Sequence, residues 1–299
     1  MTSSEMPRTD WSRRALLANA LALAGWAALP PSAGRSAAGR SRDLAMYLLE
    51  QAEARVARTE LTDAARLIRA FRTIYPGYVD SQELVRRYLR ATAVVQRDTG
   101  HGLQAVGTYR RLQAVAAQSG DEQAFIEGTI GQVIALANNE HGQQAEQVFT
   151  AYLPHMRRTA DGALGAEVAF WQARLLLDRG EAVAAEELMA GEVLPLSAAY
   201  EPTELQLARY VFMVRLALSG ERPDWRGAET ALARACATLD GNTPLLRRGQ
   251  LWTAHALLHK ASGEYDASLS YLEKAADIFG QGGVVSPGLI AMKAEIELS

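Results

Sequence analysis

Two histidines one helical turn apart are the residues best spaced for metal chemistry. His255 and His259 are four residues apart, so on a helix they would share one face, a spacing that can bind zinc. No glutamate takes the place it has in an HExxH motif, and no third ligand is evident. The remaining histidines are expected in turns or at a helix end, exposed to solvent: His101, His141 and His155. These residues therefore favour no metal site.

The single cysteine is the other residue with reactive chemistry. Cys236 lies between two alanines, where we expect a small buried side chain, and the sequence shows no base that would activate its thiol. No other catalytic constellation stands out. We predict that the chain is not an enzyme and needs no cofactor.

Arginines provide the clearest binding chemistry. Arg87, Arg90 and Arg97 are spaced by three and seven residues, so they share one helical face. Such a row suits an acidic peptide segment or a terminal carboxylate. The alternative is a solvated face whose charges pair within the chain. The 299 residues carry a net charge of only −3, and this lack of a basic excess argues against a nucleic-acid surface.

The elements that must position these residues are helices, because apolar residues recur at three- and four-residue spacing from Asp43 onward. A small residue also recurs at steps of 41, 40, 40, 43 and 40: Ala64, Ala105, Ala145, Ala185, Ala228 and Ser268. Each is followed four positions later by a large apolar residue: Ile68, Tyr109, Phe149, Met189, Leu232 and Leu272. Two helices cross closely where one offers a small side chain. We therefore predict six helical hairpins between about residues 42 and 280.

Glycines and prolines mark the expected boundaries. Three prolines are predicted to end second helices: Pro76, Pro154 and Pro195. The three extra residues of the 43-residue step are assigned to a loop at 221–224. After Gly282 and Gly283, Ser286 and Pro287 suit an N-cap and a first helical turn. A last helix to about residue 298 would then cap the stack.

The segment 251–279 resembles a tetratricopeptide repeat, a helix–turn–helix unit of 34 residues. The matching positions are Trp252, Ala256, Gly263, Tyr265 and Ala275, whereas Ser268 stands where the family usually has alanine. The resemblance implies an all-α fold for residues 39–299, a right-handed α-solenoid whose period of about 40 exceeds that of the standard repeat. It also implies a non-catalytic scaffold that binds a protein or peptide through its concave face.

In arrays of that family, set positions of each first helix form the concave wall. Carried over through the aligned small residues, these positions are Arg87, Arg90, Arg97 and Asp98 in the second unit, Glu127, Ile130 and Asn138 in the third, Glu167, Phe170, Arg174 and Asp178 in the fourth, and Gln250, Thr253 and Lys260 in the last. These residues are the predicted groove.

The N-terminal segment reads as an export signal over residues 1–38. Arg13 and Arg14 precede Ala15–Leu29, an uncharged run shorter than the roughly 20 residues of a membrane span but suited to a secretory h-region. The stretch 12–17 resembles the twin-arginine export signal. Small residues up to Ala38 offer a cleavage site before Gly39. The alternative is an uncleaved helix that touches or anchors to a membrane.

The sequence therefore predicts an exported scaffold or assembly factor, located in the periplasm or outside the cell. Two alternatives remain open. The chain could be the cytoplasmic sensor domain of a regulator, or a non-catalytic subunit of a larger enzyme complex.

Overall fold

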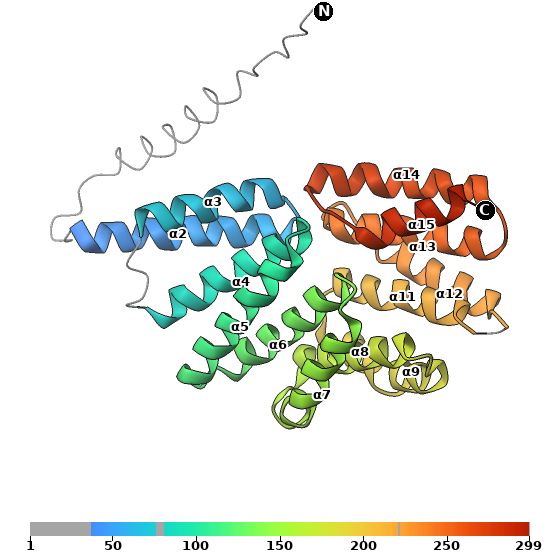
Figure 1. Cartoon of the computed structure of the whole chain (residues 1–299), viewed down its shortest axis with the longest axis horizontal. Helices are drawn as coiled ribbons and strands as arrows, with labels where there is room; N and C mark the ends of the chain where they lie inside the picture. Colours follow the sequence, from blue (N-terminus) through green and yellow to red (C-terminus); the bar gives the residue numbers. More distant parts are fainter. Residues whose placement is uncertain (1–36, 76–80, 221, 299) are drawn as a thin grey trace, which may run out of the picture. The chain divides into compact units, whose positions relative to one another are not determined.

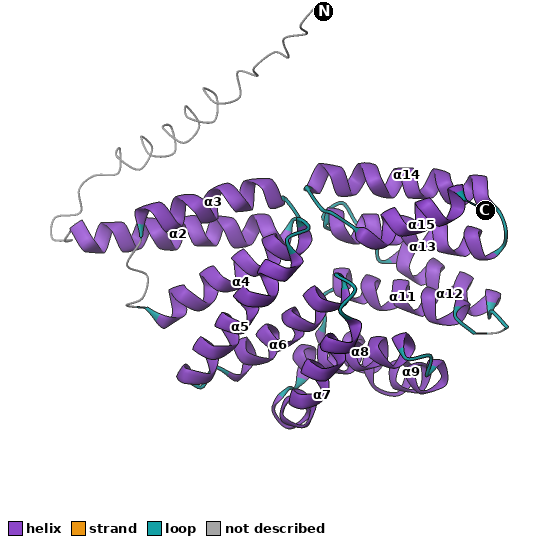
Figure 2. Cartoon of the chain, in the orientation of Figure 1, coloured by secondary structure: helices purple, strands orange, loops and turns teal. Residues whose placement is uncertain are grey.

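The computed structural model describes residues 37–75, 81–220 and 222–298 (Figure 1). Within these ranges every regular element is a helix and no strand occurs (Figure 2), which confirms the all-α class. The chain divides into two units, Met1–Asp43 and Leu44–Ser299, and apart from the first residues of α2 (Ala37–Ala57) every described helix lies in the second.

The helices follow one another as pairs joined by short turns. The pairs are α2 (Ala37–Ala57) with α3 (Leu61–Ile74), α4 (Gln82–Asp98) with α5 (Gly102–Ser119), α6 (Glu122–Ala137) with α7 (Gly142–Thr159), α8 (Gly162–Asp178) with α9 (Ala182–Leu188), α11 (Thr203–Leu218) with α12 (Trp225–Ala237), and α13 (Leu245–Ala261) with α14 (Tyr265–Gly282). The fourth pair continues through η2 (Met189–Val193) and α10 (Leu194–Tyr200), and α15 (Pro287–Glu297) follows the last pair. These bounds agree with the predicted hairpins and final helix.

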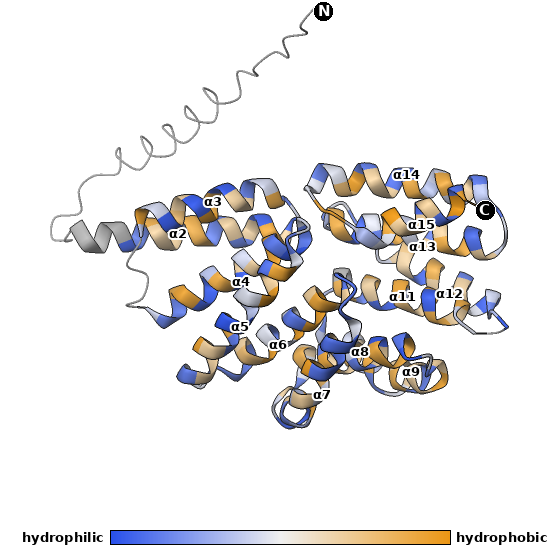
Figure 3. Cartoon of the chain, in the orientation of Figure 1, coloured by the Kyte–Doolittle hydropathy of each residue, from blue (hydrophilic) through white to orange (hydrophobic). Residues whose placement is uncertain are grey.

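Burial supports the predicted 40-residue register. All six recurring small residues are fully buried, and their large partners four positions later are buried as well. Ser268 fits the alanine position because its hydroxyl donates a hydrogen bond of 2.8 Å to the carbonyl of Ala256. At Gly131 a Cβ atom would lie 2.2 Å from the Tyr109 ring, so α6 can approach α5 this closely only through glycine. Apolar and hydrophilic residues are interspersed along the helices (Figure 3).

Turn and cap residues set where the helices start. Gly263 has a φ of +81° between α13 and α14, a left-handed conformation that favours glycine. The Asp224 side chain accepts a hydrogen bond from the Gly227 amide, so α12 begins at Trp225, directly after the predicted loop.

Two of the predicted proline boundaries are wrong. Pro154 lies inside α7, which continues to Thr159 and buries Met156 in its last part. Pro195 stands at the start of α10, directly after the π-helical turn η2. The wider π turn accommodates a residue that lacks an N–H donor, so the helical path continues through it. Pro76 lies outside the described residues.

The last helices also contact the first ones. The Val285 amide donates a hydrogen bond of 2.8 Å to the Asp98 carbonyl at the end of α4. The Leu246 amide donates to the Thr59 hydroxyl at 3.4 Å. Segments almost 190 residues apart are thus hydrogen-bonded to each other.

The residues of the predicted export signal fall mostly outside this description. Arg13 and Arg14 lie outside the described residues, and Ala38 is in the first turn of α2. In the part of the chain that the structure describes, none of the helices combines the length and the apolar character that crossing a bilayer requires.

Candidate functional site

A buried ionic network joins α8 to α11. Arg209 of α11 contacts the carboxylates of both Glu201 and Glu167, and its Nε donates to Oε2 of Glu201 at 3.1 Å. The Trp171 indole donates to Oε1 of Glu167 at 2.8 Å. The guanidinium of Arg209 lies 4.0 Å from the centre of the Phe170 ring. Glu167 is thereby held by two donors, one charged and one neutral.

These contacts decide the protonation of Glu167. Burial raises the pKa of its carboxyl, but the charge of Arg209 and the hydrogen bonds from Arg209 and Trp171 outweigh burial and lower it. In the same way, the pKa of Arg209 is raised because its carboxylate partners outweigh its burial. Both groups are therefore charged near neutral pH.

A second charged pair lies at the end of α4. Arg97 donates from Nε to Oδ1 of Asp98 at 2.6 Å and from Nη1 to the Tyr109 hydroxyl at 3.3 Å. Burial acts to lower the pKa of Arg97, but Tyr109 and Asp98 raise it more. Burial also raises the pKa of Tyr109 to about 12. The charge of Glu167 acts on Arg97 as well, so the pairs on α4 and α8 share one electrostatic environment.

Two further arginines belong to this environment. Arg247 of α13 interacts electrostatically with Glu167, Arg209, Arg97 and Asp98, and burial lowers its pKa. Arg174 of α8 interacts with Glu167 and Arg209. We call the six residues Arg97, Asp98, Glu167, Arg174, Arg209 and Arg247 the inner cluster. Its members come from α4, α8, α11 and α13, each the first helix of its pair.

The structure brings some of the predicted groove residues together. Arg97, Asp98, Glu167 and Arg174 all belong to the inner cluster. Phe170 is buried beside it, with its ring centre 5.3 Å from that of Phe212.

Several of the other predicted groove residues form ion pairs with neighbouring helices. Arg87 forms an ion pair of 2.6 Å with Glu53, and Arg90 pairs with Glu127. Asp178 pairs with Arg215 at 2.7 Å, and Lys260 with Glu295 at 2.6 Å. Gln250 accepts a hydrogen bond from Arg247, and Thr253 donates one to the Gly249 carbonyl. Ile130 is buried, and Asn138 is exposed at the C-terminal end of α6.

Sequence reasoning missed two members of the inner cluster, Arg209 and Arg247. Arg247 precedes the predicted residue Gln250 by three positions, so it shares the same helical face. Arg209 is on α11, the first helix of the one unit after Glu167 to which no groove residue was assigned. One repeat step from Glu167 would have pointed to this part of α11.

The expectation of a buried Cys236 without a base nearby is wrong. The residue is exposed, and its sulfur lies 3.7 Å from Nε2 of His255. Cys236 directly follows Ala235, which is buried on the packing face of α12. Partial burial still raises the pKa of its thiol, so the thiol is mainly protonated at neutral pH and is a weak nucleophile.

The two histidines one turn apart pack against a tyrosine. The ring centres of His255 and His259 lie 4.8 and 5.2 Å from that of Tyr271, and His259 also contacts Glu264 at 2.5 Å. Burial, followed by the charges of His259 and Lys274, lowers the pKa of His255. Among the described residues, no group of three or more side chains is arranged to hold a metal ion.

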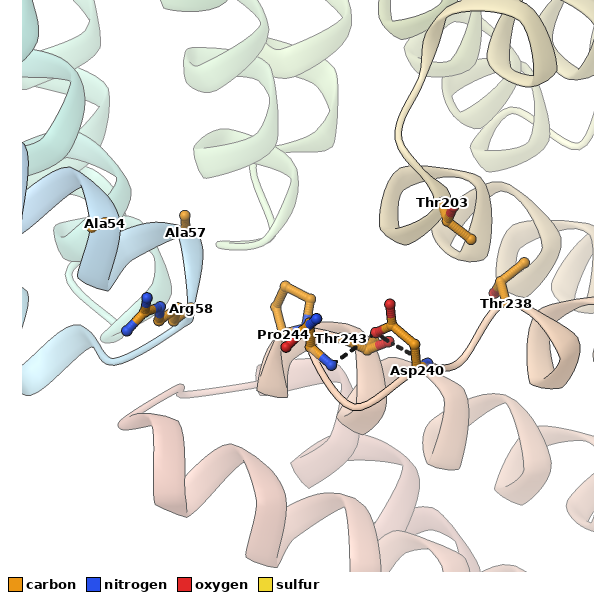
Figure 4. A pocket seen from close by; sticks show the side chains of 9 residues that line it. Ala54, Ala57, Arg58, Thr203, Thr238, Asp240, Thr243 and Pro244 are labelled. Carbon is orange, nitrogen blue, oxygen red and sulfur yellow. Dashed lines mark hydrogen bonds between the residues drawn. The ribbon is translucent and has the colours of Figure 1, made fainter.

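Figure 4 shows a small cavity of about 320 Å³, and no residue of the inner cluster lines it. Arg58 of the α2–α3 turn, Thr203 of α11 and Asp240 of the α12–α13 loop contribute to its lining. The Asp240 carboxylate accepts a 2.9 Å hydrogen bond from the Thr243 hydroxyl. The Asp240 carboxylate therefore stabilises the turn in which it lies. No predicted groove residue lines the cavity.

The sequence matches no protein-family model, and no curated protein matches it.

Proposed function

We propose that this protein is a non-catalytic scaffold that binds a protein or peptide partner through the face formed by the first helices of its pairs. The observation that carries the proposal is the inner cluster. Four first helices, far apart in the sequence, contribute charged side chains to one electrostatic environment. An extended partner could contact several of these helices at once, which is how helical-repeat proteins read their ligands.

In this proposal the helix pairs stack as a right-handed α-solenoid of tetratricopeptide-like units. Ion pairs between successive pairs of helices support the stacking, because their partners are 33 to 37 residues apart. They are Arg87–Glu53, Arg157–Glu192, Arg179–Glu146 and Arg215–Asp178. A spacing close to one repeat is expected where each unit contacts its neighbour.

The chemistry of the inner cluster favours binding over catalysis. Its arginines are fixed in place by hydrogen bonds and by aromatic rings, so they are pre-organised for a ligand. The carboxylate of Glu167 is held in its charged form by two donors, which makes it a poor general base. Cys236 has a raised pKa, so it is no better suited to nucleophilic chemistry.

We further propose that the chain is exported, with a leader over residues 1–38 that contains Arg13 and Arg14. N-terminal sequencing of the protein from its native cells tests this. A new N-terminus at Gly39 in an exported fraction is expected. An intact N-terminus in the cytosol would contradict export and favour the regulator, and recovery at fixed stoichiometry with an enzyme would favour the subunit.

Photo-cross-linking tests the binding face directly. A photoreactive amino acid replaces Gln250 on the first helix α13, and a matched variant carries it at exposed Glu229 on the second helix α12. In native cells we expect a discrete cross-linked partner from position 250 and none from position 229. A partner that cross-links only from position 229, or from neither position, would contradict the proposed face.

A further inference from the structure

Among the described residues, no carboxylate forms an ion pair with Arg174. Its guanidinium lies 4.1 Å from the centre of the Trp171 ring, and its Nε is buried without a hydrogen-bond partner among the described residues. Two carboxylates act on it electrostatically, and both contact other arginines. Asp178 contacts Arg215, and Glu167 contacts Arg209.

Arg247 is in a similar position. Among the described residues, Arg247 donates one hydrogen bond, of 2.9 Å, from Nη1 to the neutral amide oxygen of Gln250. The carboxylates that act on it, Glu167 and Asp98, are held by Arg209 and Arg97. Within the described part of the chain, α8 and α13 therefore each carry an arginine that no carboxylate contacts directly.

The balance of charges in the inner cluster favours the binding of an anion. Its four arginines outnumber the carboxylates Asp98, Glu167 and the adjoining Glu201, and among the four these carboxylates contact only Arg97 and Arg209. Burying a guanidinium without a partner is unfavourable, and the shift in Arg174 reflects this: burial, followed by the charge of Arg215, lowers its pKa to about 10. A charged residue whose burial is unfavourable in the free protein is a good candidate for a residue that contacts a ligand.

We propose that Arg174 binds a carboxylate of the partner and that Arg247 binds a second one, so the partner is an acidic peptide segment. This inference rests on the proposed function and names the partner's chemistry. A planar guanidinium can present two parallel N–H donors to a planar carboxylate. Contact with the Trp171 ring restricts the guanidinium of Arg174, and the residue is only partly buried, so part of it faces solvent. A singly charged carboxylate also meets less repulsion from Glu167 than a doubly charged phosphate would.

Peptide binding to the full-length protein tests the proposal. The probe is a capped, dye-labelled decapeptide with four glutamates, and the reference has glutamine at those positions. Fluorescence anisotropy at fixed ionic strength should show at least about tenfold tighter binding of the glutamate peptide. Arg174→Gln and Arg247→Gln should each weaken it about tenfold, the effect of one lost charge-assisted contact. Arg158→Gln, at an exposed arginine of α7, should leave it unchanged.

Three outcomes would overturn the inference. The two peptides could bind equally, the Arg174→Gln variant could bind like the unaltered protein, or inorganic phosphate could displace the glutamate peptide at equal charge concentration. The last result would mean a general anion site. If a partner still cross-links from position 250 in any of these cases, the proposed scaffold stands and only the carboxylate contact fails.

Stability of the free protein provides a second readout. If Arg174 is present for a ligand, Arg174→Gln should keep or raise the midpoint of thermal unfolding. If the residue only covers Trp171, the midpoint should fall, and Arg174→Met, which keeps the apolar stem, should restore it. A fall of this kind with unchanged peptide binding would refute the proposal.

Discussion

Arg209 and Glu201 form an ion pair that is almost entirely removed from solvent, with side chains 2% and 0% exposed. The Glu201 carboxylate also accepts a 2.5 Å hydrogen bond from the Ser197 hydroxyl, and Arg209 reaches a second carboxylate on Glu167. Burying two charges is unfavourable unless their remaining donors and acceptors are satisfied. Here both partners have further contacts, so the network is balanced as a unit and is sensitive to the loss of any member.

Replacing Arg209 should therefore be costly. Arg209→Met leaves the buried Glu201 carboxylate without its cationic partner, and we expect a loss of about 3–5 kcal/mol in the free energy of unfolding. Chemical denaturation followed by circular dichroism measures it. Arg215→Met breaks the more exposed pair with Asp178 and should cost at most about 1 kcal/mol. Equal losses in the two variants would show that burial of the Arg209 network carries no special weight.

Two glycines on neighbouring helices should respond oppositely to alanine. In Gly131→Ala the new methyl group would collide with the Tyr109 ring, and overpacking should cost about 1–3 kcal/mol. Gly107 lies within α5 with open space around it, so Gly107→Ala should stabilise the helix by about 0.5–1 kcal/mol. Urea denaturation of both variants checks the pair. Destabilisation of both would be inconsistent with the helix contact described above.

The turn before α7 contains a non-glycine residue in a left-handed conformation. Glu140 is exposed and has a φ of 64°, so Glu140→Gly should relieve strain and raise the free energy of unfolding by up to about 1 kcal/mol. Glu186→Gly, at an exposed position inside α9, should lower it by about 1 kcal/mol. Differential scanning fluorimetry of the two variants side by side tests this. Melting temperatures that fall together would argue that the turn carries no strain.

Stability should depend on pH through His255. Its folded-state pKa is below the usual value of about 6.5, so the unfolded chain takes up a proton before the folded one does. The stabilising effect of the neutral imidazole is therefore complete above pH 6.5. It decreases as the pH falls from there towards the lower folded-state pKa.

Thermal unfolding between pH 5 and 8 measures this effect. The midpoint of the unaltered protein should fall more steeply below pH 6.5 than that of His255→Gln. His101→Gln, at an exposed histidine outside the aromatic group, should keep the original slope. Identical slopes in all three proteins would mean that His255 titrates alike in the folded and unfolded chains.

Much of the architecture could be predicted because local sequence determines it. The recurring small residues, such as Ala145 and Ala228, mark where helices cross. Their spacing of about 40 residues can be recognised even where a single unit resembles a tetratricopeptide repeat only weakly. The helix ends predicted at Pro154 and Pro195 were wrong. Whether a proline ends a helix depends on the packing of the residues after it, such as buried Met156, and on a π turn that local rules do not reveal.

The inner cluster was harder to predict, because it depends on which helices face one another. Spacing alone could place Arg97 on a helical face shared with other arginines, and the resemblance to tetratricopeptide repeats could place Arg174 on the inner wall. Their ionic partners could not be placed, since Arg209 and Arg247 approach Glu167 only after four helix pairs are in position. Cys236 shows the same limit on a smaller scale, because a shift of one position on α12 exchanges burial for exposure.

The hydrogen bond from Val285 to Asp98 has a consequence for how the chain unfolds. In an array whose units touch only their immediate neighbours, the terminal units can fray independently. Here the segment before α15 is tied to the end of α4, and Leu246 is tied to Thr59, so loosening the last helices also removes partners from the first ones. Amide hydrogens at the two ends should therefore exchange with solvent in a single concerted opening rather than one unit at a time.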